Sequence, residues 1–213
     1  MFDMYAVIEE LRKVNPEGFA NINHLKFETA YAIKRFYPNA VNIAVDWNKF
    51  GDTLDLCVEI DNKRIGFHLF YLDTEEYLNL NQDIKVLTKE QLLNLVVVKT
   101  RMSYWGGVEH IEQLMQKKDI DEGFTLLITN SNEIFKKARG RQKDFDLSDG
   151  EKDGNRHLIL AYETGAPLML VDIISSYELK HFAYNKSGFN YLVLETEEDM
   201  IRPQDTGIRK DLN

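Results

Sequence analysis

The sequence contains a single cysteine, Cys57, among its 213 residues. One cysteine excludes an intramolecular disulfide and any zinc site built from several cysteines. Long apolar runs are also missing, because runs such as Leu-Val-Val-Val near residue 97 are far shorter than the roughly 20 residues of a membrane helix. The sequence shows no internal repeat, which argues against a solenoid architecture.

Positive charge is scarce, with 26 Lys and Arg residues against 35 Asp and Glu residues, a formal net charge of -9. This charge repels nucleic acid at long range, so nucleic-acid binding would require a local basic patch. The beginning, MFDMYAVIEELRKV, carries acidic residues and lacks the basic-then-apolar pattern of a secretory signal. The sequence therefore predicts a cytoplasmic protein that does not associate with membranes.

What the sequence does contain is an alternation of helix and strand patterns. The length suits one domain, which we expect at residues 1–196, followed by a polar C-terminal tail at 197–213. Helical patterns occupy 3–14, 23–36, 88–102, 107–118 and 131–138, and strand patterns occupy 40–48, the two halves of 51–71, 123–130, 157–163, 167–174, 176–184 and 189–196. Residues 139–156 form a charged loop. This order predicts a mixed α/β domain.

The aromatic pair Tyr104 and Trp105 precedes two glycines, between two of the predicted helices. We interpret this segment as a packed helix junction, with a base-stacking surface as the alternative.

The stretch GDTLDLCVEIDNKRIGFHLFY, residues 51–71, predicts two adjacent strands joined by a short turn. Because side chains alternate along a strand, Asp55 lies on the face opposite that of Leu54, Leu56, Val58 and Ile60. In the second strand, Gly66, His68 and Phe70 lie opposite Ile65, Phe67 and Leu69. If the strands pair, Asp55 and His68 can share one side of the sheet. A metal-dependent nuclease needs two carboxylates and a lysine at such a place.

This hairpin resembles the core hairpin of the restriction-endonuclease-like, PD-(D/E)xK, nucleases. Three further segments, GVEHIEQLMQKKDIDEGFTLLITN, DFDLSDG and SYELKHFAY with FNYLVLE, are similar to an uncharacterised bacterial branch of that superfamily. The resemblance covers roughly residues 20–196. It implies a restriction-endonuclease-like α/β fold, with a mixed central sheet flanked by helices and an added C-terminal strand cluster.

The resemblance also implies candidate site residues. Asp55 matches the metal-binding aspartate of the family, and Glu28 matches a helix glutamate that many members place beside the metal. His68 stands where the family has a glutamate, and Phe70 stands where it has a lysine. Asp55, Glu28 and His68 are therefore candidates for a vestigial catalytic site, and Asp55 and Glu28 for a metal site. Without the resemblance, Asp55 is a surface residue, His68 a half-buried strand histidine and Glu28 a salt-bridge partner.

The segment KKARGRQK, residues 136–143, is the one dense group of cations. Lys136, Lys137, Arg139 and Arg141 are candidates for nucleic-acid binding through phosphates. The alternative is a solvated loop whose charge is offset by the acidic run that follows.

These observations leave two hypotheses for function. The first is a catalytically degenerate nuclease-like domain that acts by binding a protein or nucleic-acid partner and needs no cofactor. The second is a Mg²⁺- or Mn²⁺-dependent DNA or RNA phosphodiesterase with a rearranged metal site. A structural protein that shares only the fold is a third possibility, and a homodimer is compatible with each.

Overall fold

The computed structural model describes residues 2–81, 87–161, 167–183 and 188–196, so the predicted tail at 197–213 lies outside the described residues. The helices are α1 (Met4–Val14), α2 (Ile22–Phe36), α3 (Thr74–Leu80), α4 (Lys89–Gln116) and α5 (Asn132–Phe135), with a short 3-10 helix, η1 (Gly140–Phe145). The strands are β1 (Val41–Lys49), β2 (Asp52–Ile60), β3 (Lys63–Leu72), β4 (Glu122–Thr129), β5 (Gly150–Lys152), β6 (Arg156–Ala161), β7 (Pro167–Ile173), β8 (Tyr177–Ala183) and β9 (Asn190–Thr196). The predicted mixed α/β class is confirmed.

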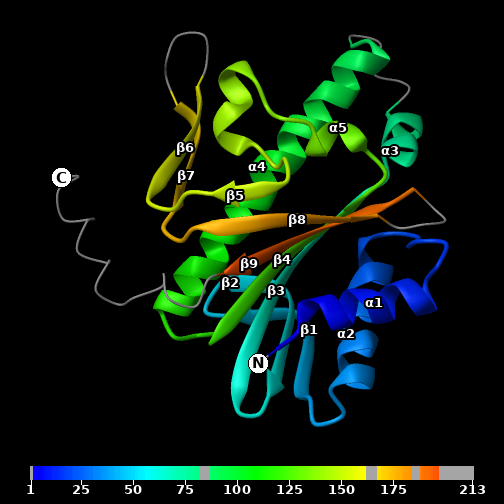
Figure 1. Ribbon diagram of the computed structural model, residues 1–213, viewed down its shortest axis with the longest axis vertical. Coiled ribbons are helices and arrows are strands. Elements are labelled where there is room, and N and C mark those ends of the chain that lie inside the picture. Colours follow the sequence, from blue (N-terminus) through cyan, green and yellow to red (C-terminus); the bar gives the residue numbers. More distant parts are fainter. Residues whose placement is uncertain (1, 82–86, 162–166, 184–187, 197–213) are drawn as a thin grey trace.

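Seven strands form one mixed sheet in the order β1-β2-β3-β4-β9-β8-β5, while β6 and β7 form a separate hairpin (Figure 1). β4 runs parallel to β3, whereas β2 is antiparallel to both of its neighbours. Parallel neighbours require a crossover connection, and α3 and α4 supply it between β3 and β4. The C-terminal strands β8 and β9 extend the sheet beyond β4 through antiparallel pairs.

Helices cover both faces of this sheet. On one face, α1 and α2 share a hydrophobic cluster with Leu56, Phe67 and Leu126 of the central strands. On the other face, α4 packs against Leu127 of β4 and against the β6–β7 hairpin. Figure 1 shows α4 crossing the sheet along much of the length of the molecule, with α1 and α2 at the end where β1 lies.

Tight turns set the register of the first three strands. Phe50 and Gly51 join β1 to β2, and Asp61 and Asn62 join β2 to β3; all four residues have positive φ. Two-residue turns with positive φ at both central positions match the twist of antiparallel strands. Lys49 therefore pairs with Asp52, and the hairpin predicted at 51–71 is confirmed.

Helix α4 is continuous, where the sequence predicted two helices, 88–102 and 107–118, with a junction at 103–106. It begins at Thr88, whose capping box with Gln91 was predicted and is confirmed. A Cβ atom on Gly107 would lie 3.0 Å from the ring of Phe70, so this glycine allows the helix to approach β3 closely. Although α4 has 28 residues, no helix in the described ranges is apolar enough over a sufficient length to cross a membrane.

Tyr104 and Trp105, which precede Gly106 and Gly107, have no exposed surface. Neither ring is available to stack on a base, so that alternative was wrong. The packing of α4 on the sheet uses both rings in the core.

The strand alternation breaks at Asp55. Leu56 and Val58 belong to the cluster beneath α1 and α2, but Leu54 joins Cys57 in a third cluster beneath α4. The prediction that Leu54 shares a face with Leu56 was therefore wrong. The reason is that the Asp55 carboxylate accepts the backbone N–H of Leu69 on β3, at 2.8 Å, and so lies between the two strands.

Three shorter elements, at two places in the chain, were not predicted. α3 begins at Asp73, whose carboxylate accepts the backbone N–H groups of Glu75 and Glu76. The predicted charged loop at 139–156 contains η1 and the short strand β5. In both places the segments are short, and neighbouring elements hold them in their fold. The local sequence pattern of such a segment is a weak predictor of its structure.

Candidate functional site

The ammonium group of Lys26, on α2, lies between two carboxylates at the edge of the sheet. Its Nζ atom is 2.6 Å from Oδ1 of Asp46 on β1 and 2.8 Å from Oδ1 of Asp55 on β2. The pairs Val45–Leu56 and Trp47–Leu54 place Asp46 opposite Asp55. Adjacent carboxylates repel each other, and the ammonium group between them offsets this repulsion.

Burial alone would lower the pKa of Lys26, but its hydrogen bonds to Asp46 and Asp55 raise it above the usual value. Burial would likewise raise the pKa of Asp55. Hydrogen bonds from His68, Lys26 and the backbone of Leu69 outweigh burial and lower that pKa to about 2. Both groups are therefore charged at neutral pH, and each holds the other in that state.

Asp55 is the first member of a hydrogen-bonded series that crosses to α4. Its Oδ2 atom lies 3.4 Å from Nδ1 of His68, and Nε2 of His68 lies 2.9 Å from Nδ1 of His110. Nε2 of His110 lies 3.5 Å from Oδ1 of Asp52, whose other oxygen is 2.7 Å from Nζ of Lys117. The series thus joins β2, β3 and the C-terminal half of α4.

The two imidazoles of this series have three contacts to satisfy, one to each carboxylate and one to each other. Each contact requires one N–H, because a neutral imidazole has one donor and one acceptor and an imidazolium has two donors. The tautomers of the two rings therefore decide which nitrogen donates in each contact. Burial first, and then the charge of His68, lower the pKa of His110, although Asp52 opposes this shift. His110 therefore resists protonation.

His68 and Phe70 were predicted at the positions of the family's glutamate and lysine. The structure brings His68 to Asp55, with both ring nitrogens of His68 already engaged. Phe70 packs against Gly107 and the ring of Tyr104, with ring centroids 6.0 Å apart. An aromatic ring held in this contact cannot position water or stabilise a phosphate.

Glu28 was predicted beside Asp55, but the structure places it against α1. Its Oε2 atom accepts a hydrogen bond from Nδ2 of Asn15 at 3.1 Å and lies 3.6 Å from Nη2 of Arg35. Residues two positions apart on a helix point about 200° away from each other. Since Lys26 reaches Asp55, Glu28 points away from it, and the two predicted metal ligands do not come together.

A cleft of ≈ 280 Å³ opens beside this site, and its lining residues are Lys26, Asp46, Asn48, Thr53, Leu54, Asp55 and His68. In the described parts of the chain, no three His, Cys, Asp or Glu side chains are grouped so that they can hold a metal ion. The charged groups of the cleft are paired with one another, and the imidazole of His68 faces two partners. The cleft is therefore lined by polar groups whose charges are largely paired within the chain.

The predicted basic residues lie far from this cleft along the chain and in space. Lys136, Lys137 and Arg139 are exposed between α5 and η1, and the structure describes only the backbone of Arg141. In Figure 1, η1 lies at the opposite end of the molecule from β1, β2 and α2.

Four residues of the site were missed by sequence reasoning: Lys26, Asp46, Asp52 and His110. For Asp46 a signal existed, because a tight turn at Phe50–Gly51 implies that Asp46 faces Asp55. Lys26, Asp52 and His110 come together only through the packing of α2 and α4 on the sheet. Comparisons with known proteins add no relative: no family model, no curated protein and no solved structure matches the chain.

Proposed function

We propose that this protein is a catalytically degenerate nuclease-like domain that acts by binding a partner. The resemblance of the 51–71 hairpin supports a nuclease-like domain. The side chains that surround Asp55 support the loss of catalysis.

The observation that carries the proposal is the place of the Lys26 ammonium group. It sits within hydrogen-bonding distance of both Asp46 and Asp55, at the aspartate that the family uses for its metal. A cation bound there by oxygen ligands would have to displace this ammonium group. The chain thus supplies its own counter-ion at the point where a nuclease binds Mg²⁺.

The order of elements supports the nuclease-like part. α2 is followed by the antiparallel strands β1, β2 and β3, and α4 then leads to β4 beside β3. This is the order in which the resemblance places its helix, its hairpin and its helix-then-strand segment. The replacement of the expected lysine by Phe70, packed against Gly107, supports the loss of catalysis.

A cleavage assay on the purified chain tests the proposal. Plasmid DNA and labelled RNA are incubated with Mg²⁺ or Mn²⁺ and either the wild-type protein or Asp55→Ala, prepared identically. We expect the same background with both proteins. Metal-dependent cleavage by the wild type that Asp55→Ala lacks would establish the alternative, a phosphodiesterase with a rearranged site.

A further inference from the structure

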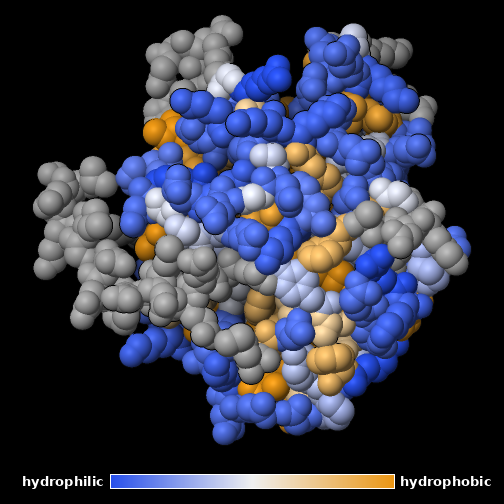
Figure 2. Space-filling view, viewed as in Figure 1, coloured by the Kyte–Doolittle hydropathy of each residue, from blue (hydrophilic) through white to orange (hydrophobic). Residues whose placement is uncertain are grey.

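The segment 136–143, called the basic loop below, presents exposed cations. The side chains of Lys137, Arg139 and Lys143 are exposed, and none of the three has an ion pair among the described residues. Lys136 lies 2.6 Å from Glu133, and its side chain is still 66% exposed. In Figure 2 the surface at this end of the molecule is strongly hydrophilic.

The acidic run that follows the basic loop is directed elsewhere. Asp146 accepts the backbone N–H of Ala138 at 2.6 Å and pairs with Lys152 at 2.8 Å, both within the fold. Burial would raise the pKa of Asp146, but hydrogen bonds from Lys152, Ser148 and the backbone of Ala138 outweigh burial and lower it. Asp149 accepts the backbone N–H of His181. The carboxylates of Asp146 and Asp149 are therefore engaged by the backbone and by Lys152 rather than by the cations of the basic loop.

A buried arginine holds the backbone of the basic loop in place. Arg101, on α4, is 5% exposed and donates hydrogen bonds to the carbonyl oxygens of Glu133, Ile134 and Lys136. It also lies 3.4 Å from Oε1 of Gln142, within the loop. A backbone fixed in this way loses little conformational entropy when its side chains meet a partner.

The basic loop offers charge without an apolar anchor. Of the apolar side chains that flank it, Ile134 and Phe145 are buried and Phe135 is half-buried against the ring of His181. The residues between its cations are Ala138, Gly140 and Gln142. Protein interfaces obtain most of their affinity from aromatic, arginine and apolar groups packed in a central pocket. A group of exposed cations without such a pocket fits a chain of phosphates better.

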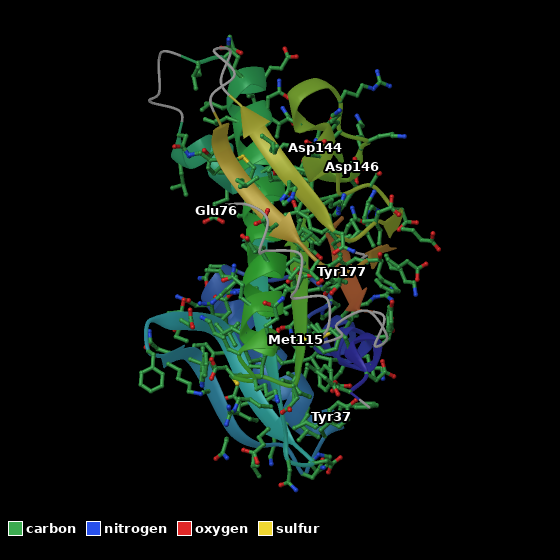
Figure 3. All side chains as sticks on the ribbon, turned by 90° about the vertical axis from the view of Figure 1, so that its left-hand side faces the viewer. Tyr37, Glu76, Met115, Asp144, Asp146 and Tyr177 are labelled. Carbon is green, nitrogen blue, oxygen red and sulfur yellow. The ribbon has the colours of Figure 1, made fainter. Side chains whose placement is uncertain are left out.

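We infer that the basic loop docks the phosphate backbone of a nucleic acid, without reading its bases. This inference rests on the proposed function, since it names the partner class of a domain that binds without cleaving. In Figure 1, η1 lies toward the end of the molecule opposite β1 and α2, which supply Asp46 and Lys26 to the lining of the Asp55 cleft. Figure 3 shows Asp144 and Asp146, next to the loop, at the end away from Tyr37.

Fluorescence anisotropy with the full chain tests the inference. The probes are a labelled single strand of about 20 nucleotides and the matching duplex, each titrated between roughly 50 and 200 mM salt. The variant Lys137→Gln/Arg139→Gln/Lys143→Gln removes the three cations. The control Lys13→Gln/Lys63→Gln/Lys118→Gln removes the same charge from exposed sites elsewhere.

We expect the wild type to bind at low salt and the loop variant to bind at least about tenfold more weakly. Because each phosphate contact contributes about 0.7 to the salt slope for single strands, that slope falls by about 2 in the variant. The control keeps the wild-type slope. Absence of binding at low salt, or an equal loss in the control, overturns the inference.

Polyglutamate at matched charge concentration serves as a competitor. If it displaces the probe as well as unlabelled DNA does, the loop recognises acidic protein surfaces and the inference fails. Failure here is distinguishable from failure of the proposed function, because the cleavage assay on Asp55→Ala does not involve the basic loop.

Discussion

The Asp55 cleft and the basic loop both carry charge, but they place it differently. In the cleft, Lys26, Asp46 and Asp55 each meet an opposite charge from the same chain. In the basic loop, Lys137 and Arg139 meet none among the described residues. Charges paired inside a fold contribute to its stability, whereas exposed unpaired charges contribute little. We therefore expect substitutions in the Asp55 cleft to change the stability of the fold, and substitutions of the cations in the basic loop to change binding.

The largest stability effect is expected for Arg101→Met, beneath the basic loop. The substitution leaves the carbonyl oxygens of Glu133, Ile134 and Lys136 without their donor. Hydrogen bonds to a charged group contribute roughly 1.5–3 kcal/mol each to stability, so we expect a loss of about 3 kcal/mol in the free energy of unfolding. Urea denaturation measures it, with the exposed Lys99→Met on the same helix as control. A loss equal to that of the control would show that the loop is not held by Arg101.

The next largest effect is expected for Asp55→Asn. The pKa of Asp55 is lowered from 3.8 to about 2, so its charge stabilises the fold above the unfolded pKa, by about 2 kcal/mol. This contribution is lost as the pH falls from about 4 through 2. Denaturation of wild type and variant at several pH values should show a gap at pH 7 that closes in acid. A gap that is independent of pH would mean that packing, rather than charge, is lost.

A smaller effect is expected from His110. Because its pKa is lowered, the unfolded chain binds protons below about pH 6.5 that the folded chain does not. Stability should therefore decrease as the pH falls below 6.5, and His110→Gln should make this decrease shallower. Thermal unfolding between pH 5 and 8 measures the slopes. His24→Gln, at a histidine outside the series, is the control, and the same slope in both variants would contradict the assignment.

The smallest stability effect is expected where the binding effect is largest. Lys137→Gln/Arg139→Gln/Lys143→Gln removes exposed cations that have no ion pair within the part of the chain that the structure describes, so the free energy of unfolding should change by less than about 0.5 kcal/mol. The same urea denaturation checks this. A loss of several kcal/mol would mean that these cations are part of the fold and would remove the contrast between the two regions.

Much of the fold could be predicted from the sequence because its signals are local. The capping box at Thr88, the alternation of Ile65, Phe67 and Leu69, and the tight turns follow from short-range rules. The single helix α4 could not be predicted, because Gly107 is favourable there only through its contact with Phe70. The break of alternation at Asp55 depends on the N–H of Leu69 in the next strand, which no local pattern reveals.

The candidate site could be predicted only where its residues follow from local sequence patterns. Asp55 and His68 were found because they lie on paired strands of one hairpin. Lys26 and His110 were missed because their helices bring them to Asp55 and His68 only after packing. The placement of Glu28 failed because a helix rotates by about 100° per residue, and its contact with Asn15 fixes which side faces α1.

The central claim, that Lys26 takes the place of a metal ion beside Asp55, is tested most directly by calorimetric titration with Mn²⁺. The wild type should give no saturable heat at millimolar Mn²⁺. Lys26→Met should gain metal-dependent heat, because it leaves the carboxylates of Asp46 and Asp55 without a cation, and Lys26→Met/Asp55→Asn should lose it again. Tight Mn²⁺ binding by the wild type that Asp55→Ala abolishes would contradict the account.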